Sequence, residues 1–202
     1  MTEALQRHRE RLQQASRIIT GQPVCIVSAA SVGLTVSPEV AALATGRHIV
    51  LNREFSETDG PLLMTAFTAH ELAHVVTANK PEHPDTVDSV TLSPVVSKSW
   101  REWPLHQGPF RWHGHDAQFI RTLCHVAHRM RGHGLPVVLP WAFHHRAYGL
   151  ASLERYAKAL GDECQSKDWL PLLEAMSGPM PEKFSKLWTA DVLRSFKKGV
   201  RS

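Results

Sequence analysis

The chain has 202 residues, of which 43% are hydrophobic and 21% are charged, and its net charge is +4 at pH 7. These proportions are those of an ordinary soluble globular protein, and they exclude disordered and low-complexity classes. A chain of this length can bury one substantial core. The three cysteines, Cys25, Cys124 and Cys164, are far apart and form no Cys-x-x-Cys pair. Neither a disulfide framework nor a thiolate zinc ribbon is therefore indicated.

The excess of positive charge is concentrated at the two ends of the chain. Arginines and lysines gather before residue 18 and after residue 182, where they are interleaved with acidic residues. This interleaving favours solvated helix faces, with weak association with DNA through the basic termini as the alternative. The first twenty residues are too charged for a secretory signal, and no run reaches the eighteen apolar residues of a membrane helix. We therefore expect a cytoplasmic protein that has no membrane partner.

The first fifty residues predict one helix followed by short strands. Leu5, Leu12, Ala15 and Ile18 among polar residues indicate an amphipathic helix over 3–18, ended by Gly21 and Pro23. Residues 24–28 read as a strand. The Ser-Pro-Glu sequence at 37–39 resembles a helix start, and a turn at 45–46 leads into a second strand over 48–52.

The middle of the chain predicts two buried helices separated by a long loop. Residues 61–77 are apolar nearly all round, which is typical of a helix inside a core. Residues 81–112 contain five prolines and little periodicity, so we expect a loop that acts as a lid or a binding segment. Residues 116–131 predict a second helix, with Phe119, Leu123 and Met130 on one buried face.

The last fifty residues predict three helical stretches, roughly 150–160, 168–177 and 181–198, which are split by glycines and a proline. In the last of them Phe184, Leu187, Trp188, Val192 and Phe196 share one stripe. Such a stripe is more often a packing face than a cofactor site.

The sequence His-Glu-Leu-Ala-His at residues 70–74 lies in the middle of the predicted helix over 61–77. Two histidines four residues apart project from the same helix face, so His70 and His74 can bind one zinc ion. Glu71, beside the first histidine, can act as general base toward water that the metal activates. Burying two histidines and a glutamate without a metal is costly, which favours a metal site over a hydrogen-bonded core.

A catalytic zinc ion keeps three protein ligands and one open position, so a third ligand is needed. The metzincin pattern fails, because it requires Gly at 77 and His at 80, where this chain has Thr77 and Lys80. Glu102 and Glu154 are alternatives without a convincing second motif. The segment 112–119 runs directly into the predicted helix over 116–131 and offers two further candidates, His113 and His115.

The His-Glu-Leu-Ala-His sequence, followed later by Gly114-His115 and by Phe119, resembles the SprT-like (Spartan-type) zinc metallopeptidases. In that family the third histidine precedes an aromatic residue by four positions, so the resemblance implies that His115 completes the metal site. The register agrees, because Phe119 can pack while His115 faces the first helix. The family further implies protein cleavage near DNA. His113 stays the competing ligand.

Several other polar residues could donate to the developing negative charge of a tetrahedral intermediate. Tyr148 is the strongest of them, because a phenol can stabilise such an oxyanion. His125 and His128 on the predicted helix, and His144 and His145 before Tyr148, are more often ordinary surface or hydrogen-bonded residues.

Together these features predict an α+β fold with a zincin-like domain over residues 20–148, in which a short sheet packs on the His-Glu-x-x-His helix. A helix over 1–19 and a helical segment over 149–202 flank it. We expect the strand near 48–52 to be the sheet edge that pairs with an extended protein or peptide substrate. The expected activity is zinc-dependent peptide hydrolysis. A DNA-associated regulatory protein and an accessory protein with a structural zinc are the alternatives.

Overall fold

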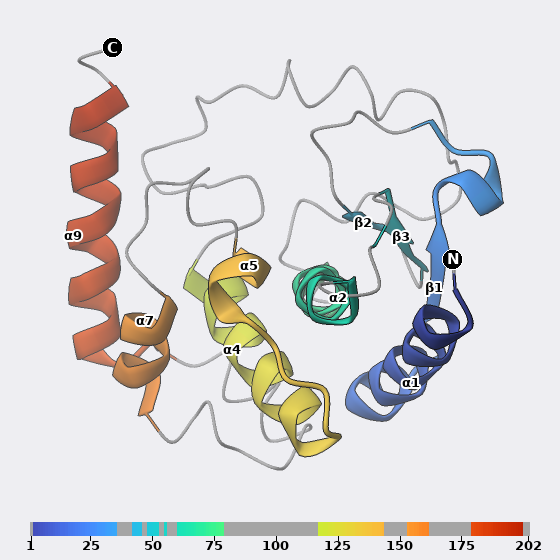
Figure 1. The fold of residues 1–202 in the computed structure, drawn as a ribbon. Coiled ribbons are helices and arrows are strands. Elements are labelled where there is room, and N and C mark those ends of the chain that lie inside the picture. Colours follow the sequence, from blue (N-terminus) through green and yellow to red (C-terminus); the bar gives the residue numbers. More distant parts are fainter. Residues whose placement is uncertain are drawn as a thin grey trace.

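The computed structural model describes residues 2–35, 42–45, 48–52, 55, 60–78, 117–143, 153–161 and 179–199. Several helices surround a small three-stranded sheet (Figure 1), which confirms the expected α+β class. In chain order the elements are α1 (Glu3–Thr20), β1 (Cys25–Ser28), the 3-10 helix η1 (Ala30–Val32), β2 (Ala42–Thr45), β3 (His48–Leu51), α2 (Gly60–Ala78), α4 (Ala117–Gly132), α5 (Leu139–Phe143), α7 (Leu153–Leu160) and α9 (Glu182–Gly199).

The sheet has the strand order β1-β3-β2, with β3 parallel to β1 and antiparallel to β2. The prediction that the strand near 48–52 forms the edge is therefore wrong, because β3 lies between two neighbours and β2 is the edge strand beside α2. The sequence missed β2 because Ala42–Thr45 shows no alternation of polar and apolar residues. Thr45 belongs to β2 and pairs with His48, whereas Gly46, the other residue of the predicted turn, lies outside the described residues.

Helix α1 follows the sequence prediction closely at both ends. The hydroxyl of Thr2 accepts the N–H of Leu5 and caps the first turn, and Gly21 ends the helix with a φ of 66°. On the far side of the sheet from β2, the side-chain oxygen of Gln13 accepts the N–H of Ile26 at 3.1 Å. Helix α1 thereby covers the outer edge of β1, which would otherwise expose unpaired backbone groups.

The start of α2 is packed tightly against α1. A Cβ atom on Gly60 would lie 2.9 Å from the Cβ of Phe55 and 3.0 Å from the Cδ2 of Leu5. One turn later, the Nε2–H of His8 donates to the hydroxyl of Thr65 at 2.9 Å, and this hydroxyl donates to the carbonyl of Pro61 at 2.7 Å. Gly60 is thus required by the close approach of Leu5 from α1 and of Phe55, which precedes α2 in the chain.

We expect Gly60→Ala to lower the free energy of unfolding by about 1–3 kcal/mol, because the added methyl group overpacks this contact. Gly132→Ala is the matched control, since nothing lies within 4 Å of a Cβ at that position, also at a helix end. Urea unfolding of both variants checks the prediction. Equal stability of the two variants would contradict the packing at Gly60.

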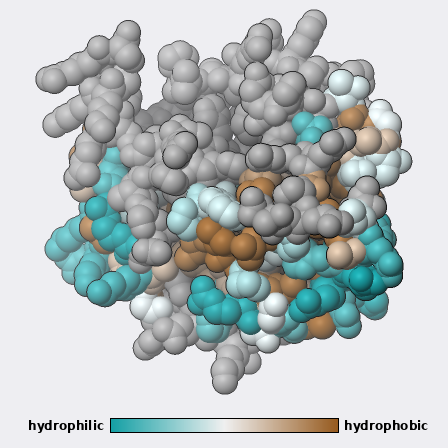
Figure 2. All heavy atoms as spheres, in the orientation of Figure 1, coloured by the Kyte–Doolittle hydropathy of each residue, from teal (hydrophilic) through white to brown (hydrophobic). Residues whose placement is uncertain are grey.

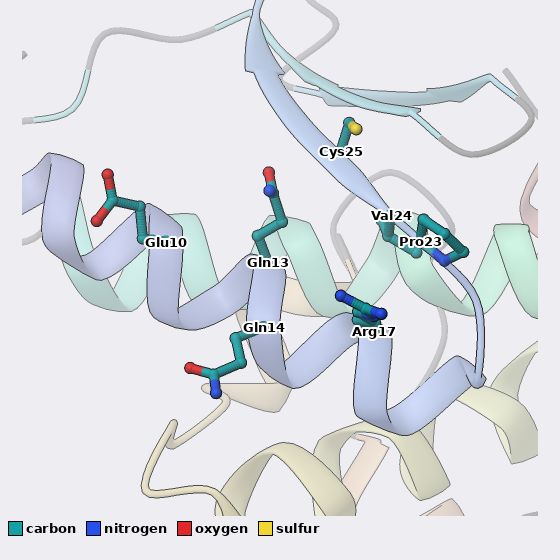
Figure 3. Close-up of a pocket in the computed structure, with 7 residues that line it drawn as sticks. All are labelled: Glu10, Gln13, Gln14, Arg17, Pro23, Val24 and Cys25. Atoms are coloured by element: carbon teal, nitrogen blue, oxygen red, sulfur yellow. The ribbon is translucent and has the colours of Figure 1, made fainter.

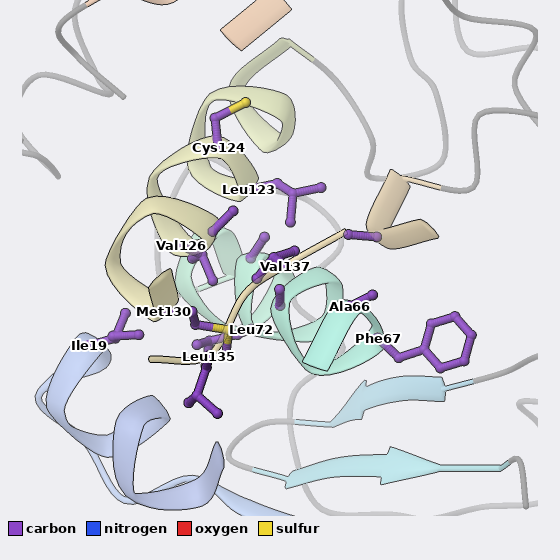
Figure 4. Packing of buried hydrophobic residues seen from close by; sticks show 14 of the residues in the cluster. Ile19, Ala66, Phe67, Leu72, Leu123, Cys124, Val126, Met130, Leu135 and Val137 are labelled. Carbon is purple, nitrogen blue, oxygen red and sulfur yellow. The ribbon is translucent and has the colours of Figure 1, made fainter. Parts of the chain in front are cut away.

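One hydrophobic cluster unites the described elements, with α2 at its centre (Figures 1 and 4). Helix α2 contacts α1, α4, α5 and the sheet, which explains why it is apolar nearly all round. The predicted apolar face of α4 is confirmed, because Phe119, Leu123, Val126, Ala127 and Met130 are all buried in this cluster. The same cluster includes residues of α1, α7 and α9.

Helices α7 and α9 are held together by an aromatic group and a buried carboxylate. The ring of Tyr156 contacts Phe184 and Trp188, and its hydroxyl donates to the Oδ2 of Asp191 at 2.5 Å. Arg155 also donates to Asp191. Burial raises the pKa of Tyr156 well above its usual value, so the phenol stays protonated as a donor. The predicted packing role of Phe184 and Trp188 is confirmed.

Among the residues that the structure covers, no helix is both long enough and apolar enough to cross a bilayer.

Candidate metal centre

His70 and His74 lie one turn apart on α2, and their rings converge. The two Nε2 atoms are 3.2 Å apart. Two nitrogen ligands placed about 2.05 Å from a zinc ion in tetrahedral directions would be about 3.3 Å apart. His70 is buried and His74 half-buried, so water can still reach the pair from one side. The spacing of these donors therefore fits a shared metal ion.

The ring of His70 is oriented by the backbone of α5. Its Nδ1 lies 2.5 Å from the carbonyl oxygen of Ala142. A carbonyl can only accept, so Nδ1 carries the proton and donates, which leaves the lone pair of a neutral ring on Nε2. Metal-binding histidines commonly make this contact, which fixes the ring and its tautomer. The lone pair on Nε2 of His70 can accept a hydrogen bond from His74 or bind a metal ion.

Phe119 of α4 packs against both imidazole rings. Its ring centroid is 5.0 Å from that of His70 and 4.5 Å from that of His74. Phe119 is fully buried, so it limits the rotation of both histidines from the side of α4. The predicted packing of Phe119 at the first helix is confirmed, and it brings the start of α4 to the two histidines.

Glu71 is buried on α2, with 7% of its surface exposed. Burial raises the pKa of its carboxyl to about 8, and a hydrogen bond from the backbone N–H of Ala44 in β2 acts in the opposite direction. A divalent cation nearby favours the ionised carboxylate and lowers such a pKa. The carboxyl thus lies between the helix that carries the histidines and the edge strand of the sheet.

Several predicted site residues lie outside the described part of the chain, among them His113, His115, Glu102, Tyr148, His144 and His145. Glu154 belongs to α7, but its side chain is also outside the description. Within the described ranges, no group of three or more metal-ligating side chains comes together. The third ligand therefore stays a prediction. Thr77, at the position where the metzincin pattern has glycine, lies within α2, and its hydroxyl donates to the Ala73 carbonyl at 2.9 Å.

Two contributors to the site were missed because they act through the backbone. The Ala142 carbonyl accepts from His70, and the backbone of Ala44 acts to lower the pKa of Glu71. An alanine carries no side-chain chemistry, so sequence reasoning had no signal for either residue. Only the packing of α5 and β2 on α2 reveals them.

His125 differs from the expectation of an ordinary surface or hydrogen-bonded histidine. It is fully buried in α4, and neither ring nitrogen has a hydrogen-bond partner among the described residues. Burial lowers the pKa of His125 to about 3, and the nearby charges of Arg121 and His128 act in the same direction. His125 is therefore neutral in the folded protein at neutral pH.

We expect acid to destabilise the protein through His125. In the unfolded chain this histidine titrates near pH 6.5. Below that pH it binds a proton, whereas His125 in the folded chain stays neutral. The free energy of unfolding is therefore largest above pH 6.5 and falls as the pH decreases toward 3. At pH 5 the loss is up to about 2 kcal/mol. His125→Leu should lose less stability than wild type between pH 7.5 and pH 5 in urea unfolding. An identical pH dependence for the two proteins would contradict this account.

The surface next to His70 has an apolar component. Figure 2 shows hydrophobic atoms reaching the surface near the middle of the view, where Figure 1 places α2 and α5. Trp141 of α5 is 40% exposed and directly precedes Ala142, whose carbonyl holds His70. At least one large apolar side chain is therefore exposed on the helix whose backbone orients His70.

A separate hollow of about 300 Å³ lies between α1 and β1, and none of its lining residues belongs to α2 (Figure 3). Gln13, Gln14 and Arg17 line it from the helix, and the exposed Cys25 lines it from the strand. This hollow is not part of the candidate metal centre.

Comparison with protein-family models, curated proteins and solved structures finds no match to this chain. The function must therefore be argued from the site itself.

Proposed function

We propose that the protein is a zinc-dependent metallopeptidase in which His70 and His74 bind the metal and Glu71 is the general base. The observation that carries this proposal is the pair of Nε2 atoms 3.2 Å apart, with His70 held by the Ala142 carbonyl. Without a metal the two rings can share a hydrogen bond over this distance, and a metal ion that replaces the shared proton would bind both nitrogens. Nitrogen donors with this spacing fit zinc better than the oxygen-rich sites of calcium or magnesium.

In the proposed hydrolysis, the metal ion and Glu71 have different roles. A bound zinc ion supplies a Lewis acid that activates water and polarises the carbonyl of the scissile bond. The carboxylate of Glu71 accepts the proton of the attacking water and returns it to the leaving amine. The buried setting of Glu71 keeps bulk water from competing for this proton.

His115 is proposed as the third ligand. It lies two residues before Ala117, the first residue of α4, so the chain keeps it within about 7 Å of that residue. Phe119, one turn into α4, contacts the rings of His70 and His74. Support for His115 over Glu102 and Glu154 is therefore the proximity of the start of α4 to both histidines. Tyr148 is proposed as a hydrogen-bond donor to the developing oxyanion. A relationship to the SprT-like peptidases is also a proposal, and it is supported by the sequence motifs alone.

The edge strand β2 is proposed as the site that aligns the substrate. It is the outer strand of the described sheet, and it packs on α2, the helix that carries Glu71. An extended peptide can add to such an edge through main-chain hydrogen bonds, which explains selection of protein substrates without a deep pocket.

The proposal is tested by adding one equivalent of zinc to the metal-free protein and incubating it with an intrinsically disordered protein. Mass spectrometry then detects new peptide ends. Cleavage that requires zinc supports a peptidase. Unfolding on zinc removal, with no cleavage by the loaded protein, would instead favour a structural zinc, and salt-dependent retention on DNA without cleavage would favour the DNA-associated alternative.

A further inference from the structure

Helix α9 carries a more one-sided surface charge than its sequence indicates. Its lysines and arginines are interleaved in the chain with Glu182 and Asp191, a pattern typical of a solvated helix. In the fold, however, Asp191 is only 2% exposed, and its carboxylate accepts hydrogen bonds from Arg155 and Tyr156 of α7. The negative charge of Asp191 is therefore neutralised inside the α7–α9 contact and does not offset the cations on the surface of α9.

The cations of α9 lie on one side of the helix. Phe184, Trp188 and Asp191 form the buried side, which packs on α7. Lys183 and Lys186 are exposed on the adjoining side. At about 100° per residue, every lysine and arginine of α9 falls within about 60° of Lys183 around the helix axis, and neither acidic residue of α9 does. These basic residues are Lys183, Lys186, Arg194, Lys197 and Lys198.

A shallow hollow adjoins this basic side, on the face of α9 that points away from α7. Its volume is about 410 Å³, and its lining includes Ala190 and Leu193, of which Leu193 is 48% exposed. Glu182 also lines the hollow and is paired with Lys186. Figure 1 shows α9 at the rim of the molecule, with α7 on its inner side. An exposed leucine and a row of cations thus lie side by side on the outer surface of α9.

We propose that this face of α9 is a docking surface for an unfolded segment of another protein in which acidic residues are mixed with aliphatic ones. The row of cations complements carboxylates, and the hollow at Ala190 and Leu193 takes an aliphatic side chain that lies between them. A nucleic acid would match the charge, but its backbone has no aliphatic group for Leu193, and the Glu182 carboxylate at the hollow repels phosphate. The docking surface needs neither zinc nor Glu71, so this inference is independent of the proposed function.

Binding is measured by the fluorescence anisotropy of a labelled, disordered peptide rich in glutamate, aspartate and leucine, added to the full chain without zinc. We expect the double variant Lys183→Glu, Lys186→Glu to raise Kd about tenfold, because each reversal replaces an attraction by a repulsion. The matched control Arg11→Glu, Arg17→Glu makes the same change in net charge at exposed positions of α1. Because salt screens charges that are remote from the bound peptide, this control should keep Kd within about twofold of wild type.

A second pair of variants tests the apolar part of the surface. Leu193→Ser should raise Kd for the same peptide about fivefold, because the leucine loses its aliphatic contact. The variant should have no such effect on a peptide in which every leucine is replaced by serine. Ile18→Ser is the matched control, since Ile18 is also about half exposed but lies on α1. Circular dichroism of each variant checks that these surface changes leave the helices intact.

Three outcomes would overturn the proposal. Equal losses of affinity in the charge variants of α9 and α1 would mean that net charge alone attracts the peptide. Tighter binding of a single-stranded oligonucleotide of equal charge, unaffected by Leu193→Ser, would assign this face to nucleic acid. Failure of the wild-type chain to bind the acidic peptide would exclude the docking surface altogether.

Discussion

Replacing any one of the three proposed ligands by alanine should remove most of the zinc affinity. Structural zinc sites with four ligands bind with about 10–16 kcal/mol, so each ligand contributes about 2.5–4 kcal/mol. We therefore expect His70→Ala, His74→Ala and His115→Ala each to weaken binding by about 10²–10³-fold. Competition with a chromophoric chelator measures this loss directly.

The same experiment distinguishes the candidates for the third ligand. His113→Ala should keep the metal even if turnover falls, and Glu102→Gln and Glu154→Gln should bind zinc as wild type does. A His115→Ala variant with unchanged affinity would exclude this histidine. Zinc loss in one of the glutamate variants would then identify the ligand and remove the basis for the SprT-like resemblance.

Glu71→Gln should bind zinc normally and lose roughly 10²–10⁴-fold in kcat, because an amide cannot accept the proton of the attacking water. Glu71 is buried on α2, and a glutamine of nearly the same shape can occupy the same space. The measurement is kcat at saturating zinc together with the zinc content of the variant.

Two outcomes would contradict the assignment of Glu71. Loss of zinc in Glu71→Gln would mean that Glu71 is itself a ligand. Retained turnover would point to a different base or to a contaminating peptidase, which the metal-free wild type reveals as a blank. Neither outcome depends on which residue is the third ligand.

The regular helices were predictable from the sequence because each carries a strong local signal. Helix α1 has an amphipathic repeat and ends at Gly21, and α2 is apolar nearly all round. The order of the strands was not predictable, since β2 has only four residues of weak pattern and is stabilised by pairing with β3 and packing on α2. Because β2 was not predicted, β3 was wrongly expected to be the edge strand.

The part of the candidate site that consists of side chains on a single helix was predictable from the sequence. The four-residue spacing on α2 is enough to bring together His70 and His74, and the placement of Phe119 followed from its position in the predicted helix. The Ala142 carbonyl and the Ala44 N–H depend on which distant segments pack on α2, so the residue types gave no indication of them. His125 was misjudged because the burial of its helix face depends on tertiary packing.

Anomalous diffraction at the zinc absorption edge, on crystals of the zinc-loaded protein, tests the central claim most directly. We expect a single peak about 2.0–2.1 Å from the Nε2 atoms of both His70 and His74. The His70 Nδ1 should still contact the Ala142 carbonyl in that map. A zinc peak elsewhere on the chain, with no density between these two nitrogens, would contradict it.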